Sequence, residues 1–310
     1  MPRYHVSRSI MIDADPQLVY DTVADFGTWT TWSPWLCCEP DAEVTVTDNC
    51  SSVGSVYKWT GNVVGAGEIE HRKLQPGSLI DQQIRFLRPF KSVSRVYFEV
   101  EPAGDQSRIT WHMQGSLPFF LFWMKSSLET FIGMDYERGL KMLKELVETG
   151  QVQATTKIRG IETVGPMRVM GVRAQSRMNE CGDLMKDAFH KSAEDLQAAG
   201  VKLDREVLTV YHATDLKKRT FDFTAGFVVP EDAPTVAGLS DVRVPSTSAF
   251  CVQHEGSYDH LGNAWTAAYK NIEGRKLKAN KKIPALEIYR NNPEETPEAE
   301  LQTDIIVPIR

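Results

Sequence analysis

The chain has 310 residues, of which 42% are hydrophobic and 25% charged, so it is long enough for two cores and too balanced for extended disorder. Its net charge is −6: residues 1–150 carry 14 basic and 19 acidic side chains, and residues 151–310 carry 21 and 22. Neither half therefore offers the basic surface that nucleic-acid binding requires, and no nucleic-acid partner is expected.

Sequence motifs exclude several other classes of protein. The five cysteines form no CxxC pair and the seven histidines are scattered, so we expect neither a disulfide framework nor a metal site. Dinucleotide, phosphate-loop and GxSxG motifs are absent, and no cofactor is expected. The first ten residues lack the apolar core of an export signal, and the longest apolar run, 117–124, is far shorter than the ~20 residues of a membrane span. A cytoplasmic protein without a membrane partner is predicted.

The first half of the chain has the pattern of one sheet and one long helix. Residues 6–12 are predicted to form a strand, and Asp15 before Pro16 caps a short helix. Period-two runs then predict an antiparallel meander over 55–60, 67–74, 79–87, 94–101 and 108–115. Apolar residues at three- and four-residue steps predict a long helix from Leu128 to Val147, with Gly150 as its C-terminal cap. A curved sheet on one helix leaves room for a ligand where inward side chains do not fill it.

The second half contains a repeated pattern after a polar segment, 151–156, that is predicted to be a linker. The unit is strand, helix, strand, strand, over 167–174, 182–197, 206–213 and 220–228. It recurs over 248–254, a helix from Tyr258 to Ile272, 284–289 and 303–309. Such a duplication predicts two copies related by a pseudo-twofold axis, with a groove between them.

Particular motifs carry a resemblance to two families. With ADP at 14–16, WSPW at 32–35 and GMDYERGL at 133–140, residues 1–150 resemble the polyketide-cyclase branch of the START-like helix-grip superfamily. With HEGSY at 254–258, PALEIY at 284–289 and TDIIVPI at 303–309, residues 157–310 are similar to the gyrase-inhibitor-like, AraC-type effector-binding domain. The implied fold class is α+β: a helix-grip domain followed by a duplicated β-α-β-β domain.

The second resemblance implies a pocket for amphipathic, often cationic, aromatic compounds, with Glu287 as the charged contact. The spacing agrees, because period two places Glu287 and Tyr289 on one strand face and Leu286 and Ile288 on the other. We expect the apolar face to pack on the helices and Glu287 to face the groove. A hydrated surface glutamate is the alternative interpretation.

Aromatic side chains supply the remaining candidate ligand contacts. The candidates in the second half are Tyr289, Trp265, Tyr258, Phe223 and Phe227, and those in the first half are Trp59, Trp111 and Trp32. The alternative for each is that it only fills a core. Rings around a carboxylate would suit a cationic aromatic ligand.

The sequence favours a small-molecule sensor or sequestering protein that binds small hydrophobic or amphipathic ligands in both domains. Transcription regulators among the relatives carry a separate DNA-binding module. No helix-turn-helix pattern precedes either domain here, so this chain is not expected to be such a regulator by itself. An enzyme is the alternative, either a hydrolase of reactive ring compounds with Glu287 as general base, as some relatives imply, or a cyclase-like activity in the first domain. A third hypothesis treats both domains as protein-interaction surfaces with filled cores. Ligand identity, turnover, coupling of the pockets and a homodimer stay open.

Overall fold

A computed structural model describes residues 3–203 and 206–310 and divides the chain into two compact units, Met1–Gln153 and Ala154–Arg310. The first two residues of the predicted N-terminal domain lie outside the described residues.

The N-terminal unit is built on one antiparallel sheet of seven strands. The strands are β1 (Arg3–Ile12), β2 (Glu43–Val46), β3 (Val56–Thr60), β4 (Ala66–Gln75), β5 (Leu79–Arg88), β6 (Ser92–Ala103) and β7 (Gln106–Ser116). Their order in the sheet is β1-β7-β6-β5-β4-β3-β2. Strands β3 to β7 therefore form the predicted meander, the short strand β2 extends it beyond β3, and β1 forms the other edge of the sheet by pairing with β7 along its whole length.

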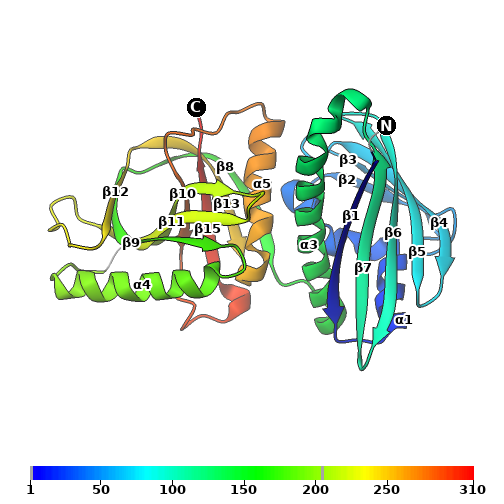
Figure 1. Cartoon of the computed structure of the whole chain (residues 1–310), viewed down its shortest axis with the longest axis horizontal. Coiled ribbons are helices and arrows are strands. Elements are labelled where there is room, and N and C mark those ends of the chain that lie inside the picture. Colours follow the sequence, from blue (N-terminus) through cyan, green and yellow to red (C-terminus); the bar gives the residue numbers. More distant parts are fainter. Residues whose placement is uncertain (1–2, 204–205) are drawn as a thin grey trace. The chain divides into compact units, whose positions relative to one another are not determined.

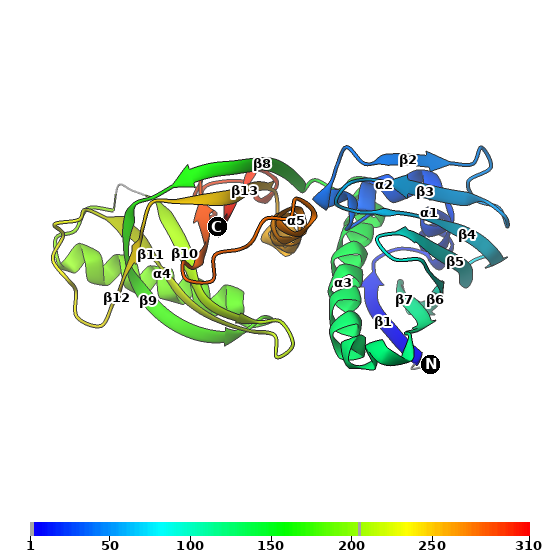
Figure 2. The same ribbon diagram turned by 90° about the horizontal axis from the view of Figure 1, so that it is seen from above.

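One long helix lies against this sheet. The helices are α1 (Pro16–Ala24), η1 (Phe26–Thr28), α2 (Trp29–Trp32), η2 (Leu36–Cys38), η3 (Phe119–Met124) and α3 (Lys125–Thr149). The Asp15 carboxylate accepts a hydrogen bond from the Gln17 backbone N–H, and Gly150 ends α3 with φ of 84°, a left-handed conformation that suits glycine. Figures 1 and 2 show the sheet bending around α3. The helix-grip arrangement is confirmed.

Large aromatic side chains fill the space between this sheet and its helices. Trp111 on β7 stacks on Tyr136 of α3 with ring centroids 3.9 Å apart, and Trp32 meets Trp111 edge-on. His71 on β4 is fully buried and stacks on Phe26 at 3.9 Å. The core of this unit is therefore aromatic-rich.

The C-terminal unit is built on an eight-stranded antiparallel sheet. The strands are β8 (Thr155–Val164), β9 (Met167–Arg177), β10 (Val207–Asp215), β11 (Thr220–Val229), β12 (Ser240–Val244), β13 (Thr247–Glu255), β14 (Ala285–Tyr289) and β15 (Gln302–Pro308). The helices are α4 (Cys181–Ala198), η4 (Tyr258–His260), α5 (Leu261–Gly274) and η5 (Glu298–Glu300).

The strand order shows the predicted duplication. It reads β12-β9-β11-β10-β14-β15-β13-β8, so the unit β9-α4-β10-β11 and the unit β13-α5-β14-β15 meet where β10 pairs with β14. Each unit is also preceded by a strand that pairs with the other copy: β8 with β13, and β12 with β9. This mutual exchange of edge strands joins the two copies into one sheet.

The two exchanged strands were not predicted. Strand β8 begins at Thr155, inside the segment expected to be a linker. Its residues alternate between exposed and half-buried, and none of them is fully buried. Strand β12 has only five residues. A short or half-exposed edge strand lacks the strong apolar alternation on which the sequence analysis depended.

Candidate ligand-binding site

Glu287 lies at the junction of the two copies, on β14 directly opposite Thr209 of β10. Its side chain is on the same sheet face as both helices of the unit, since it contacts Trp265 of α5, while Tyr289, two residues on, contacts Met185 of α4. The glutamate is only 3% exposed. The structure therefore places it in the interior rather than on the surface.

Three aromatic side chains donate hydrogen bonds to this carboxylate. Trp265 Nε1 donates to Oε1 at 2.5 Å, and the Tyr289 and Tyr211 hydroxyls donate to Oε2 at 2.7 and 2.9 Å. Thr209 Oγ1 lies 3.2 Å from the Tyr289 hydroxyl and extends the network. The donors come from three elements and both copies of the repeat, so the site depends on the way the duplicated units pack.

Burial shapes the electrostatics of the cluster. Loss of hydration raises the pKa of Glu287 above the usual value for a glutamate, although the hydrogen bonds from Trp265, Tyr289 and Tyr211 act in the opposite direction. The pKa values of Tyr211 and Tyr289 lie well above the ordinary range, because both are buried and next to this carboxylate. Within the described parts of the chain, no lysine or arginine pairs with Glu287.

Further aromatic rings extend from the carboxylate toward solvent. The Trp265 ring meets Tyr211 edge-on at 5.3 Å and stacks on Tyr269 at 6.1 Å. Tyr258 meets Tyr289 edge-on at 5.9 Å. Tyr258 and Tyr269 are 37% and 49% exposed, whereas Glu287 is almost completely covered. Contacting aromatic rings therefore extend from the buried Glu287 carboxylate to the exposed Tyr258 and Tyr269 near α5.

The expectation for the opposite face of β14 was wrong. Leu286 and Ile288 do not pack on the helices. They belong to a buried cluster that also contains Leu208, Val210 and Ile306. Apart from Ile283, all members of this cluster are strand residues, and none comes from α4 or α5. The helices cover the face that carries Glu287. The sheet has a second apolar layer on its other side, so period two alone could not tell which layer the helices cover.

The two phenylalanine candidates lie at different distances from the carboxylate. Phe223 is fully buried beneath α4, and its ring centroid is 6.5 Å from that of Tyr211. Phe227 packs with a separate cluster at the other end of β11 and contacts Phe189, whose ring in turn meets Tyr289. The structure brings Phe223 next to the site and connects Phe227 to it only through Phe189.

Tyr211, Thr209 and Met185 were not among the predicted site residues. Thr209 and Tyr211 alternate with buried Leu208 and Val210 on β10, so period two could have placed them on one face. Their meeting with Glu287 depends on the pairing of β10 with β14, which joins the two copies. Nothing in one sequence specifies that pairing.

The N-terminal tryptophans lie within the other unit. Trp32 and Trp111 are 1% and 2% exposed and are part of the aromatic core. Trp59 on β3 is half-buried, with its N–H donating to the Val64 carbonyl at 3.3 Å. The buried N–H of Trp111 has no hydrogen-bond partner among the described residues.

Residues 3–203 and 206–310 contain no group of three or more His, Cys, Asp or Glu side chains arranged to hold a metal ion. None of the helices in these ranges combines the length and apolar character needed to cross a bilayer.

The fold and the site define an α+β protein with two domains of small-molecule-binding type. Residues 3–148 match the family described as polyketide cyclase / dehydrase and lipid transport, and residues 160–310 match the GyrI-like small molecule binding domain. The chain is therefore a START-like domain of the polyketide-cyclase type fused to a GyrI-like domain, and the predicted resemblance is confirmed.

Solved structures with similar folds match one half of the chain each. Aha1 from Colwellia psychrerythraea is 18% identical and aligns over 47% of this chain and 97% of its own, with a TM-score of 0.36. The EcmrR C-terminal domain is 18% identical over 51% of this chain and 98% of its own, with a TM-score of 0.43. CalU16 from Micromonospora echinospora is 13% identical over 48% and 87%, with a TM-score of 0.34. A comparison with curated proteins gave no match.

Proposed function

We propose that the GyrI-like domain binds an amphipathic molecule that carries a cationic group on an aromatic or apolar body, with the cation against Glu287. The observation that supports this proposal is a carboxylate that is 3% exposed, held by three neutral aromatic donors and paired with no cation among the described residues. An ionised carboxylate without a partner is costly to bury, and a bound cation would remove that cost.

The surroundings of Glu287 favour an aromatic cation over an inorganic one. The faces of Trp265, Tyr258 and Tyr269 would receive the body of such a ligand, and a cation near the edge of the cluster would gain from the negative faces of the rings. A hydrated metal ion would gain nothing from these apolar surfaces. The proposed role is that of a sensor or a sequestering protein.

The test measures binding of tetraphenylphosphonium, with triphenylphosphine oxide as a neutral probe of similar shape, by calorimetry on the full chain. Replacing Glu287→Gln keeps the side-chain shape and removes the charge. We expect it to weaken binding of the cation about 100-fold and to leave binding of the neutral probe nearly unchanged, because only the cation loses a buried opposite charge. Glu255→Gln, on an exposed residue of β13, is the matched control.

Acidity provides a second readout of the same proposal. The pKa of Glu287 is raised by burial, so protonation removes the charge at a higher pH than for an exposed glutamate. Binding of the cation should therefore weaken as the pH falls through this raised pKa, and the variant Glu287→Gln should show no such decrease. Equal affinities of the parent and this variant for the cation would contradict the proposal.

The raised pKa of Glu287 would also suit a general base, so the hydrolase remains the alternative function and needs its own test. Reactive ring compounds that enter the site would then be recovered as hydrated products. Mass spectrometry of a reactive cyclopropane compound after incubation with the full chain separates the two functions: an unchanged compound supports a sensor, whereas a hydrated, ring-opened product that is lost with Glu287→Gln supports the hydrolase.

A further inference from the structure

One end of the N-terminal sheet carries most of its exposed apolar side chains. The β5–β6 turn and the β7–α3 connection meet there, because Phe86 pairs with Ser92 at the start of β6, and Arg95 pairs with Gln114 near the end of β7. The exposed apolar side chains of these two segments, called the apolar end below, are Leu87, Phe90, Val93, Phe119, Phe120, Phe122, Trp123 and Met124.

The degree of exposure at the apolar end is unusual for aromatic residues. Phe90 is 82% exposed, Phe119 77% and Trp123 67%. An aromatic side chain buries about 150–250 Å² when it is covered. Several exposed aromatic side chains together therefore form a patch of several hundred Å², the size that marks an interaction surface. The apolar end therefore has the composition of a surface that is covered in the working protein.

Charge at the apolar end has one sign. Neither 85–98 nor 106–128 contains an aspartate or glutamate, whereas Arg88 and Lys91 are exposed in the β5–β6 turn. Arg3, opposite Ser116 on β1, adds a third cation at this end of the sheet. Exposed Phe and Trp side chains with basic neighbours match the boundary between headgroups and acyl chains of an anionic bilayer.

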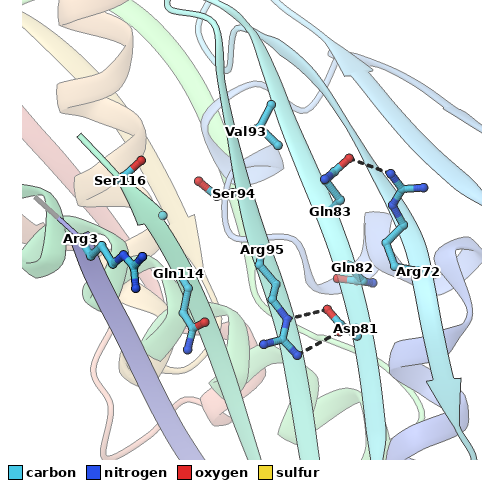
Figure 3. A pocket seen from close by; sticks show the side chains of 11 residues that line it. Arg3, Arg72, Asp81, Gln82, Gln83, Val93, Ser94, Arg95, Gln114 and Ser116 are labelled. Carbon is cyan, nitrogen blue, oxygen red and sulfur yellow. Dashed lines mark hydrogen bonds and ion pairs between the residues drawn. The ribbon is translucent and has the colours of Figure 1, made fainter. Parts of the chain in front are cut away.

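A polar groove adjoins the apolar end on the sheet. Its volume is about 550 Å³, and Val93 and Ser116 line it together with Arg3, Arg72 and Arg95. Figure 3 shows Arg95 directed at Asp81, with which it forms two hydrogen bonds of 2.9 Å. Gln114 lies on the neighbouring strand β7, and Arg3 lies on β1, beyond β7. Arg95 and Arg72 are already paired with Asp81 and Glu70, so Arg3 is the guanidinium group of this groove that we expect to contact a phosphate headgroup beside the apolar end.

We propose that the apolar end docks the N-terminal domain on the surface of a membrane that contains anionic phospholipids. The side chains of Phe119, Phe122 and Trp123 enter the interfacial layer, and Arg3, Arg88 and Lys91 contact the headgroups. The sequence predicted no membrane partner because it contains no membrane span. Docking at the interface needs only exposed aromatic side chains and a basic rim.

The test is co-sedimentation of the full chain with vesicles of phosphatidylcholine alone or with 30% phosphatidylglycerol. We expect binding that is stronger with phosphatidylglycerol and weaker at high salt, because exposed charges are screened. The variant with Phe122→Ser and Trp123→Ser should bind at least about 10-fold more weakly, because two aromatic side chains would no longer enter the apolar layer of the bilayer. Lys91→Glu should reduce only the preference for the anionic vesicles.

Val53→Ser is the matched control, because Val53 is 62% exposed in the β2–β3 connection, away from the apolar end. Circular dichroism checks that each variant is folded. The proposal is overturned if the parent chain stays in the supernatant with both vesicles, or if the serine variants sediment as well as the parent. It is also overturned if these variants abolish a dimer seen by light scattering while vesicles do not bind, since the occupant would then be a second copy.

Discussion

Among the buried titratable groups whose charged forms are disfavoured, Glu287 and His71 lie in different units and have different consequences. Glu287 belongs to the candidate site, where a ligand would compensate its charge. His71 has no comparable role. Its ring, on β4, is buried against Phe26, and this burial lowers its pKa to about 4. Its Nε2 lies 2.9 Å from the Ala24 carbonyl oxygen. Because protonation of the imidazole is unfavourable in the fold, His71 makes stability depend on pH.

Stability of the N-terminal domain should fall in mild acid through His71. The imidazole of the unfolded chain takes up a proton near pH 6.5, and the folded one only near pH 4, so stability is complete above pH 6.5 and is lost as the pH falls toward 4. The lost free energy of unfolding is about 3 kcal/mol for a shift of this size. Urea unfolding at several pH values, followed by tryptophan fluorescence, measures it, because six of the seven tryptophans lie between residues 29 and 123.

The variant His71→Gln should be less stable than the parent at neutral pH and should lose less stability between pH 6.5 and 4. His190→Gln is the control, since that side chain is exposed on α4 and lies outside the N-terminal unit. The explanation fails if His71→Gln and the parent lose the same free energy over this range.

For helices and strands, the period of the apolar residues predicted the type and the approximate position of most elements. The meander, the long helix and both repeats follow from side chains that alternate between core and solvent along each element. The partners of Glu287 could not be predicted in the same way, because Tyr211 and Trp265 reach it through the pairing of β10 with β14 and the packing of α5. The exchange of β8 and β12 is likewise a property of the assembled sheet.

A pair of facing glycines allows β9 and β11 to approach each other closely. Gly171 and Gly226 are register partners, and a Cβ on Gly226 would lie 2.2 Å from the Met170 carbonyl oxygen and 2.6 Å from the Gly171 Cα. Those are backbone atoms and cannot move aside like a side chain. Gly226→Ala should therefore reduce the free energy of unfolding by about 1–3 kcal/mol, as overpacking usually does. Urea unfolding followed by circular dichroism measures this loss.

Gly182→Ala provides the comparison within the same domain. Nothing lies within 4 Å of the Cβ that this change would add on α4, so it should leave stability unchanged or raise it by about 0.5–1 kcal/mol. If the two substitutions had the same effect, close backbone approach would not explain the glycine at position 226.

At the scale of the whole molecule, each unit has the core that independent folding requires. The aromatic cluster of the first unit contains residues from Tyr4 to Val152, and the clusters around Leu208, Met170 and Phe223 contain residues of the second unit alone. About 150 residues are enough to bury a stable core. The site around Glu287 is likewise built from residues of the second unit.

Fragments 1–153 and 154–310 should therefore fold when they are produced separately. We expect a cooperative thermal transition for each, and fragment 154–310 should bind tetraphenylphosphonium within about twofold of the full chain, a difference below about 0.5 kcal/mol. Fragment 1–153 should bind anionic vesicles through the apolar end but should not bind the cation. An aggregated fragment 154–310, or one whose affinity falls more than tenfold, would show that the ligand site needs the first unit for its structure. Because Glu287 and its three hydrogen-bond donors all follow residue 154, we expect the site to survive the separation.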